Sequence, residues 1–400
     1  MGSNPASRAT PAPVNAFKRV SGLTTPIQIV GAGIAGLACA IACRQLGLPV
    51  AVFEQADGPR PEGAGIQLSP NAVRILNNLG LATGLQDLAV APRAIRLRDL
   101  RTGASLACLP AGPDFVSRFG QPTLTIRRAD LQAVLLDRAK ALNIPVVWDQ
   151  HIRADAVIHT SATGAWVGAD GLWSQLRSAV PEAQAPRATG QAAIRGLLHI
   201  CPNPRSEMGR EITVWCGQGA HLVGYPLGRH ESYGFVLIHP ELPNMAQGWS
   251  SAVTPTALAP IFSACHGMLR DILCSVDDWR GWALHATPPL PGPEVLHHGR
   301  LALIGDAGHA MRPHLAQGAA MGLEDAWTLA QCLHDAGPSR LELAMARYGT
   351  ARWQRVRQVQ LRAGRSGRIF QLGGPMGLAR NMALRLMGPR LMDQAWLWAD

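Results

Sequence analysis

Three glycines near the start of the chain have the spacing of a phosphate-binding turn. Gly31, Gly33 and Gly36 follow the apolar run 27–30 and precede a segment with helical periodicity. Gly31 permits a tight turn, Gly33 lets the backbone approach a pyrophosphate, and Gly36 lets the helix pack close to the strand. The unpaired N–H groups of the helix N-terminus would face the phosphates. The pattern predicts a phosphate-binding βα unit.

An acidic residue completes this pattern. Glu54 directly follows a second apolar run, residues 50–53, which comes after the expected helix. A carboxylate at the end of that strand can accept hydrogen bonds from ribose hydroxyls. The two runs, the helix and the acid together predict a bound adenine dinucleotide rather than an ordinary glycine-rich turn.

The composition is that of an ordinary globular chain. The sequence has 400 residues, of which 47% are hydrophobic, and a formal net charge of +10. We interpret the arginine cluster in 352–368 as a solvated helical face, because no nucleic-acid-binding motif accompanies it. No apolar stretch is long enough to span a bilayer. We therefore expect neither a nucleic-acid partner nor a membrane span.

The cysteines and the N-terminus point to a reducing environment and a flexible arm. The eight cysteines have no metal-ligand spacing, which predicts a cytoplasmic protein without a metal site. Cys39 and Cys43 lie one helical turn apart and are expected in the core. Residues 1–25 are rich in Ala, Pro, Ser and Thr, and we expect them to form a disordered arm.

Hydrophobic periodicity and turn residues give the order of the elements. Ser69 could cap a helix that has Pro70 at its first position. Helices are expected over 35–46, 71–79, 129–142 and 319–335 and near the C-terminus; short strands are expected over 93–126, 144–167 and 191–284, and a buried strand over 301–304.

Two further motifs follow the glycine-rich turn in chain order. Residues 168–177 read GADGLWSQLR, and residues 305–313 read GDAGHAMRP. Together the three motifs resemble the single-component FAD-dependent aromatic hydroxylases, the class that includes p-hydroxybenzoate hydroxylase. The chain is most similar to the branch of salicylate hydroxylase and 6-hydroxynicotinate 3-monooxygenase. Supporting segments are 63–71 (GAGIQLSPN), 128–131 (RADL) and 313–319 (PHLAQGA), and the resemblance covers about residues 26–400.

The resemblance implies the fold and its division into domains. The expected class is α/β, with a Rossmann-like FAD-binding domain, an inserted and mostly antiparallel β-sheet domain for the substrate, and a helical C-terminus. We assign residues 26–190 and 288–345 to the FAD-binding domain, 191–287 to the substrate domain and 346–400 to the C-terminal helices.

The resemblance also implies how the cofactor is held. Asp306 would bind the ribose–ribityl chain of FAD, and Arg128 would reach its phosphates. The turn Asp170-Gly171 would hold FAD and shape the groove for the nicotinamide cofactor. The helix that opens at Gln317 would point its positive end at the flavin N1–C2=O edge and stabilise the reduced anion. The cofactor-binding candidates are Gly31, Gly33, Gly36, Glu54, Gly65, Arg128, Asp170, Gly171, Asp306, Gln317, Gly318 and Ala319.

The implied reaction is hydroxylation of an aromatic ring. NADH or NADPH would reduce FAD, and reduced FAD would bind O2 as a C4a-hydroperoxide. Its distal oxygen would attack a small aromatic or heteroaromatic substrate, most simply a hydroxy acid. The site would have to exclude water, because the hydroperoxide otherwise decays to hydrogen peroxide. We expect the enzyme to act as a monomer or a homodimer.

His221, Tyr225 and His314 are the candidate catalytic residues. On a strand over 221–226, His221 and Tyr225 share one face. His221 could accept the phenolic proton near neutral pH, and Tyr225 could orient the ring. A sheet pair without a chemical role is the alternative. His314 precedes the flavin-facing helix and could contact the substrate or only support its loop.

Several features leave the substrate and the cofactor affinity open. Arg195 could hold a substrate carboxylate or pair with an acid, and His309 is expected to pack beneath its loop. The segment 144–168 is short by about a hairpin, Ala316 stands where many relatives have Gly, and Arg312 is unusually bulky. Hydroxylation of a urate-like or quinolone-like heterocycle is one alternative, and a flavin-binding protein that has lost turnover is another. A flavin halogenase is disfavoured because the GWxWxIP signature is absent.

Overall fold

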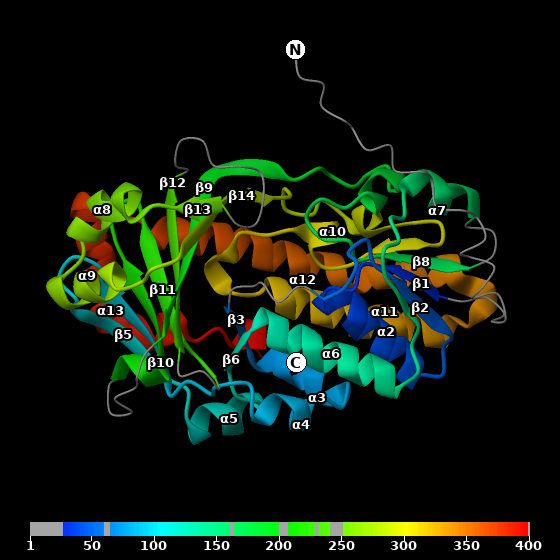
Figure 1. Ribbon diagram of the computed structural model, residues 1–400, viewed down its shortest axis with the longest axis horizontal. Coiled ribbons are helices and arrows are strands. Elements are labelled where there is room, and N and C mark those ends of the chain that lie inside the picture. Colours follow the sequence, from blue (N-terminus) through cyan, green and yellow to red (C-terminus); the bar gives the residue numbers. More distant parts are fainter. Residues whose placement is uncertain are drawn as a thin grey trace, which may run out of the picture.

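A computed structural model describes residues 27–59, 65–160, 164–199, 207–228, 232–240 and 251–398. The expected N-terminal arm lies outside these residues. Two β-sheets lie at opposite ends of the molecule, and the long helix α12 (Leu341–Phe370) runs past both of them (Figure 1).

The first sheet has the strand order of a doubly wound nucleotide-binding fold. The order is β15-β16-β8-β1-β2-β7, and only the β15–β16 pair is antiparallel. Across the sheet, the five parallel strands therefore stand in the chain order third, second, first, fourth, fifth, as in a Rossmann fold. They are β1 (Ile27–Val30), β2 (Val50–Phe53), β7 (Val146–Val147), β8 (Ala165–Gly168) and β16 (Leu301–Leu303), with β15 (His297–His298) at the edge.

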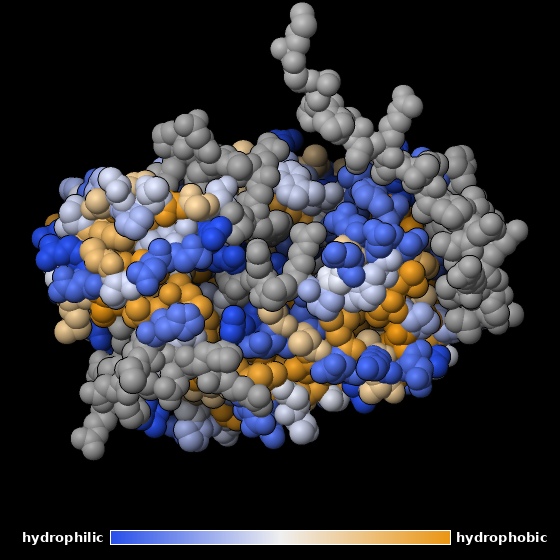
Figure 2. All heavy atoms as spheres, in the orientation of Figure 1, coloured by the Kyte–Doolittle hydropathy of each residue, from blue (hydrophilic) through white to orange (hydrophobic). Residues whose placement is uncertain are grey.

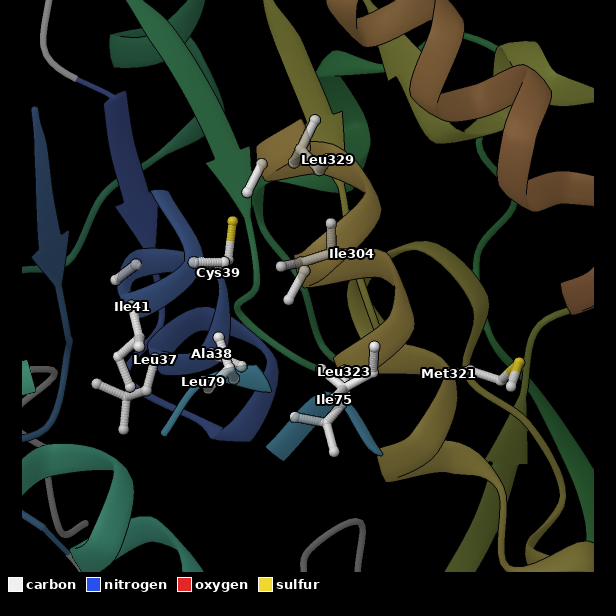
Figure 3. Close-up of a cluster of buried hydrophobic side chains, with 14 of the residues drawn as sticks. Leu37, Ala38, Cys39, Ile41, Ile75, Leu79, Ile304, Met321, Leu323 and Leu329 are labelled. Atoms are coloured by element: carbon white, nitrogen blue, oxygen red, sulfur yellow. The ribbon is translucent and has the colours of Figure 1, made fainter. Parts of the chain in front are cut away.

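The main core lies between this sheet and two helices, α2 (Ile34–Gln45) and α11 (Gly318–Ala336). Figure 3 shows apolar side chains of α2 and α11 meeting between the helices, with Ile304 beside them. Cys39 and Cys43 are fully buried there, which confirms their expected place in the core. Small side chains on α2 let the two helices pack closely.

The second sheet is larger and mostly antiparallel. Its order is β13-β14-β9-β12-β11-β10-β4-β5, and only the β10–β4 pair is parallel. The strands are β4 (Ala94–Asp99), β5 (Ser105–Pro110), β9 (Arg187–His199), β10 (Glu211–Cys216), β11 (His221–Leu227), β12 (Ser232–Pro240), β13 (Ser251–Val253) and β14 (Trp279–Ala286).

The hairpin β4–β5 departs from the division of the chain that the sequence suggested. It lies within 26–190, which was assigned to the FAD-binding domain, but β4 pairs with β10 of the second sheet. The two strands are separated by more than a hundred residues in sequence. Such a pairing leaves no periodic signal, so sequence analysis had no means of detecting it.

Helices replace strands in parts of three segments that were expected to be β-structure. The interval 191–284 contains α8 (Pro255–Ser263) and α9 (Gly267–Cys274), which pack on one face of the second sheet against Trp215 and Phe235. α5 (Pro113–Phe119) and α7 (Ala154–Thr160) interrupt the other two. The remaining elements are α3 (Pro70–Asn78), α4 (Ala82–Gln86), α6 (Arg128–Ala141), α10 (Asp306–His309), α13 (Gly374–Met392), α14 (Ala395–Trp398), β3 (Gly65–Leu68) and β6 (Leu124–Arg127).

The opposite face of the second sheet is turned toward α12 and α13. Val214 and Val223 pack there with Phe370 and Leu384. Because side chains alternate along a strand, the face of β11 that carries Val223 also carries His221 and Tyr225.

On the face of the molecule drawn in Figure 2, hydrophilic residues are interspersed with apolar residues. Among the helices of the described ranges, none combines the length and the apolar character that crossing a lipid bilayer requires.

We expect Leu323→Ala to lower the free energy of unfolding by about 2–5 kcal/mol, because it leaves a cavity between α2 and α11. Leu323 is fully buried, whereas the side chain of Leu378 on α13 is 68% exposed. The same truncation at Leu378 should therefore change the stability little. Urea unfolding of both variants measures the difference, and equal losses would contradict this description of the core.

Candidate active site

The glycine-rich turn leaves room at one position only. At Gly31, where φ is +110°, a Cβ would overlap the carbonyl oxygen of Ala169, and at Gly36 a Cβ would overlap the carbonyl oxygen of Gly31. At Gly33, which caps α2, a Cβ would meet no atom of the described residues within 4 Å. Two glycines are thus needed by the protein itself, and the third faces open space. This cradle fits a pyrophosphate at the helix N-terminus.

Glu54 lies beside the same turn, at the carboxyl end of β2. One of its oxygens accepts the N–H of Ala32 at 2.7 Å and the other accepts the N–H of Ala56 at 2.9 Å. A carboxylate oxygen has two acceptor sites, so each can still accept a hydroxyl of a ribose. Gln132 on α6 donates to the carbonyl oxygen of Ala32 at 2.8 Å, which fixes the turn from the other side.

The second motif follows β8, the strand next to β1. The Oδ2 atom of Asp170 accepts the N–H groups of Gln175 and Leu176, at 2.7 and 3.2 Å. Its Oδ1 atom is buried and has no hydrogen-bond partner within the described ranges. Gly171 has a φ of +77°, which favours glycine. An unsatisfied buried oxygen in this position fits a hydroxyl or amide donor of a bound cofactor.

Arg177 ties the second motif to the third. Its guanidinium donates to the carbonyl oxygens of Leu172, Asp306 and Ala307, each at 2.9 Å. The side chain is buried. The turns after β8 and β16 are therefore held in one arrangement, and Asp306 is placed by its backbone while its carboxylate stays available for a ligand.

The third motif packs directly against the glycine-rich turn. Gly305, with φ +57°, lies so close to Ala35 that an added Cβ would come within 3.2 Å of the Ala35 Cβ. Gly322 on α11 approaches Ala35 in the same way, at 3.1 Å. Asp306 and the N-terminal parts of α2 and α11 therefore border a single region.

A cluster of buried ion pairs holds the turn after β16 in this arrangement. Asp325 on α11 accepts the N–H of Gly305 at 2.9 Å, His309 Nε2 at 2.5 Å and Arg352 Nε at 2.8 Å. The carboxylate of Glu324 accepts a hydrogen bond from the guanidinium of Arg352 at 2.7 Å. It also accepts two hydrogen bonds from the guanidinium of Arg355, at 2.6 and 2.7 Å. His309 thus packs beneath its loop, where the sequence analysis placed it.

Electrostatics keep Asp325 ionised in the interior. Burial alone would raise the pKa of its carboxyl group, but His309, Arg352 and the hydrogen bond from Gly305 outweigh that effect and bring the pKa to about 2. The neighbouring carboxylates likewise outweigh burial at Arg352 and raise the pKa of its guanidinium. The cluster is therefore charged at neutral pH and depends on all of its members.

Gln317 anchors the start of α11. Its Nε2 donates to Ser69 Oγ at 2.8 Å, and its Oε1 accepts from Asn71 at 3.2 Å. The Ser69 hydroxyl donates to the Asn71 side chain at 2.6 Å and does not cap α3, which corrects the expected capping bond. At Gly318 a Cβ would meet nothing within 4 Å among the described residues. The first N–H groups of α11, including that of Ala319, are thus held rigidly beside an open space.

Two further candidates, Arg128 and Gly65, and the unusual residue Ala316 belong to neighbouring segments. Ala316 has a φ of +53°, in the left-handed region that favours glycine. Arg128 begins α6, and its side chain is exposed. Gly65 begins β3, and a Cβ there would overlap the ring of Tyr225.

Of the three candidate catalytic residues, His221 and His314 come together, whereas Tyr225 contacts a different segment. The rings of His221 and His314 have their centroids 5.1 Å apart, and the ring of Phe370 lies 5.4 Å from that of His221. The Tyr225 hydroxyl donates to the carbonyl oxygen of Gly65 at 3.0 Å. His221 and Tyr225 share one face of β11, as predicted, but they contact different segments of the first domain.

Burial keeps both histidines neutral. It lowers the pKa of His221 to about 3, with a further contribution from His314, and it lowers the pKa of His314 to about 4, aided by Arg312. Burial also raises the pKa of the Tyr225 hydroxyl. At neutral pH each imidazole therefore has one N–H and one acceptor nitrogen.

A hollow of about 150 Å³ lies beside Tyr225. Three arginines line it, together with Gly65 and Asp278: Arg127, Arg195 and Arg280. Arg280 contacts Asp278 at 2.7 Å, and Arg195 lies over the ring of Trp282. The positive lining suits an anionic group. Elsewhere, no group of three or more His, Cys, Asp and Glu side chains that could hold a metal ion occurs in the described part of the chain.

The residues that sequence analysis missed all act through contacts between distant segments. Arg177 lies within a motif that was singled out, but its role as a clamp was not visible. The adjacent acids Glu324 and Asp325 in the otherwise apolar run 318–327 were the available signal, because buried carboxylates require cationic partners. Arg352 was instead assigned to a solvated face, yet it is buried.

Comparisons with known proteins identify the family and the fold. The family model of the FAD binding domain matches residues 24–363. A 3-amino-4-hydroxybenzoate 2-monooxygenase of Streptomyces platensis is 34% identical over 93% of this chain and 95% of its own length. A 6-hydroxynicotinate 3-monooxygenase of Pseudomonas fluorescens is 31% identical over 84% of this chain and 89% of its own. A salicylate hydroxylase substrate complex superimposes with a TM-score of 0.76, at 24% identity, covering 94% and 96% of the two chains.

We expect Gly33→Val to abolish tight FAD binding while leaving the fold intact, because its side chain would enter only the open space of the cradle. Gly36→Val should instead destabilise the protein, since it collides with backbone. Flavin absorbance and thermal unfolding of the apoprotein separate the two effects. Gly267→Val, at another open helix start, serves as the control. Retention of FAD by Gly33→Val would contradict the cradle.

We expect Asp325→Asn to cost roughly 3–5 kcal/mol of stability at neutral pH, because it leaves Arg352 with a weakened partner in the interior. In the wild type, the pKa of Asp325 falls from 3.8 to about 2 on folding. The resulting stability is present above pH 4 and amounts to about 2 kcal/mol, which is lost as the pH falls from 4 through 2.

Denaturant unfolding as a function of pH tests this expectation. The Asp325→Asn variant should lack that part of the acid sensitivity. Asp271→Asn, which removes an exposed carboxylate, should alter neither quantity. If the free energy of unfolding of Asp325→Asn fell between pH 4 and pH 2 as it does in the wild type, the acid sensitivity would not come from Asp325.

Proposed function

The chain belongs to the FAD-binding family of aromatic monooxygenases, and on that premise we propose that it hydroxylates a small aromatic or heteroaromatic acid that carries a ring hydroxyl or amino group. The relatives are named for substrates of this kind. The observation that carries the proposal is the meeting of β11 with the first domain. Its two polar side chains contact Gly65 at one end and the His314 loop at the other, the two segments next to the cradle.

The proposed overall reaction consumes one aromatic ring C–H, O2, NAD(P)H and a proton, and yields the hydroxylated ring, water and NAD(P)+. When bound, FAD supplies the redox chemistry: it takes the hydride from the nicotinamide and activates O2 for transfer of one oxygen atom. We include NADH or NADPH and O2 as partners in this proposal. The reducing, cytoplasmic location and a monomeric or homodimeric state are also part of it.

Each residue of the cradle would bind a different part of FAD. The start of α2 and Gly33 would bind the pyrophosphate, Arg128 would reach the phosphates, and Glu54 would accept the ribose hydroxyls. Asp306 would accept hydroxyls of the ribityl chain, and the orphan oxygen of Asp170 would accept a further donor. The N–H groups at Gly318 and Ala319 would face the flavin ring, where a helix N-terminus stabilises negative charge.

The substrate would lie between this end of the cradle and the inner face of β11. His221 would contact a ring oxygen, and the rings of His314 and Phe370 lie beside it. Tyr225 borders the other side, and Arg195 in the adjacent hollow is suited to a substrate carboxylate. Both histidines are buried, and a substrate bound against them would be shielded from water, which favours oxygen transfer over loss as hydrogen peroxide.

A panel of aromatic acids tests the proposal directly. Substrate-stimulated NAD(P)H oxidation, with the product identified by mass and hydrogen peroxide measured in parallel, distinguishes coupled hydroxylation from futile oxidation. Benzoates and pyridinecarboxylates that carry hydroxyl or amino groups should give a product heavier by one oxygen. A yellow protein that only produces peroxide with every compound would contradict the proposal.

We expect His221→Ala to lower the yield of hydroxylated product on the order of 10²-fold, because the contact to the ring oxygen is lost. Its FAD content should remain that of the wild type, since His221 does not contribute to the cradle. Product per NAD(P)H consumed and the flavin-to-protein ratio are the two measurements. An unchanged product yield would remove His221 from the mechanism.

A further inference from the structure

The side chain of Gln371 contacts Nδ1 of the His221 imidazole, the ring nitrogen opposite to Nε2. Its Nε2 lies 3.2 Å from His221 Nδ1 and donates to the carbonyl oxygen of Ile238 at 3.4 Å. Its backbone oxygen accepts the N–H of Gly219 at 3.0 Å, in the turn just before β11. Side chain and backbone together fix Gln371, which follows α12, relative to His221.

A chain of hydrogen bonds determines which way the Gln371 amide points. Arg312 donates to Gln191 Oε1 at 3.4 Å, and Gln191 Nε2 donates to Gln371 Oε1 at 2.8 Å. A guanidinium can only donate and a backbone carbonyl can only accept. Arg312 at one end and Ile238 at the other therefore each require the same orientation, with the Gln371 NH2 group toward His221.

This orientation decides the tautomer of His221. Its Nδ1 faces an N–H donor and must accept, so the single proton of the neutral ring resides on Nε2. That Nε2 atom is fully buried and has no hydrogen-bond partner in the described portion of the chain. A buried donor without a partner calls for an acceptor from a bound molecule.

Protonation of the ring would break this arrangement. An imidazolium carries a second N–H on Nδ1, which would face the Gln371 NH2 group donor to donor. His314 and Arg312 on the adjoining loop add no negative charge that could compensate, and no carboxylate contacts the ring in the described residues. The geometry therefore disfavours proton uptake by His221.

We propose that Gln371 is a positioning residue that holds His221 in its Nε2–H tautomer, so that His221 donates a hydrogen bond to a ring oxygen of the substrate instead of removing a proton from it. The inference rests on the proposed function for the nature of the substrate. It replaces the sequence-based expectation that His221 accepts the phenolic proton. The matching substrate class is an aromatic acid whose ring oxygen is bound as an anion or as a carbonyl tautomer.

The tautomer can be observed without turnover. The holoenzyme labelled with ¹⁵N-histidine should give, for His221, a pyrrole-type Nε2 signal and a pyridine-type Nδ1 signal, assigned by their loss in His221→Gln. In Gln371→Glu a carboxylate replaces the amide donor, and the proton should move to Nδ1. Gln360→Glu is the matched control, because Gln360 is a buried glutamine of α12 that contacts Leu290 and Thr287 and does not touch His221. A proton on Nδ1 in the wild type would overturn the proposal.

Coupled turnover gives a second, independent readout. The amide N–H of His221→Gln can still donate, whereas His221→Leu cannot. We expect the glutamine variant to form roughly 10- to 100-fold more product per NAD(P)H than the leucine variant, at equal FAD content. We expect Gln371→Glu to lose product yield by a similar factor. Equal yields from the two His221 variants would overturn the donor role.

The two proposals fail in different ways. If the wild type hydroxylates no aromatic acid, the proposed function fails, while the ¹⁵N signals still report whether Gln371 sets the tautomer. If the wild type hydroxylates its substrate and His221 carries its proton on Nδ1, only the inference about Gln371 fails.

Discussion

The carboxylate of Asp325 is the interaction on which the rest of the site depends. It lies in the interior and reaches the turn after β16, the loop histidine and an arginine of α12 at the same time. A charge in that position is tolerable only when each of these partners is present. Because the same turn packs on Ala35 of the glycine-rich segment, the charge also fixes the spacing between the first and third motifs.

The second constraint is the contact between the second sheet and the first domain. The inner face of β11 rests on β3 at Tyr225 and on the loop before α11 at His221. α12 passes along both domains and brings Phe370 and Gln371 to the same place (Figure 1). The chemistry assigned to this protein requires a reactive ring and a substrate to meet out of water, and the junction of the second sheet with the first domain would provide that enclosure.

The sequence predicted those features of the molecule that depend on residues close together in the chain. The glycine-rich turn with Glu54, and the shared face of His221 and Tyr225, follow from spacing along single elements. The pairing of β4 with β10 and the clamp formed by Arg177 follow from contacts between distant segments, which no periodicity records. Ser69 shows the same limit, because its hydroxyl has a better partner in Asn71 than in the helix it begins.

The position of Arg352 in the chain has a consequence for how the enzyme is made. The segments that surround the cofactor are spread from residue 31 to residue 319, and the arginine that neutralises their central charge comes later still. On the ribosome, the nucleotide-binding turn emerges long before this counterion does. The nascent chain therefore cannot complete its flavin site until Arg352 has left the ribosome, so flavin capture follows the synthesis of the strands of both sheets rather than that of the glycine-rich turn.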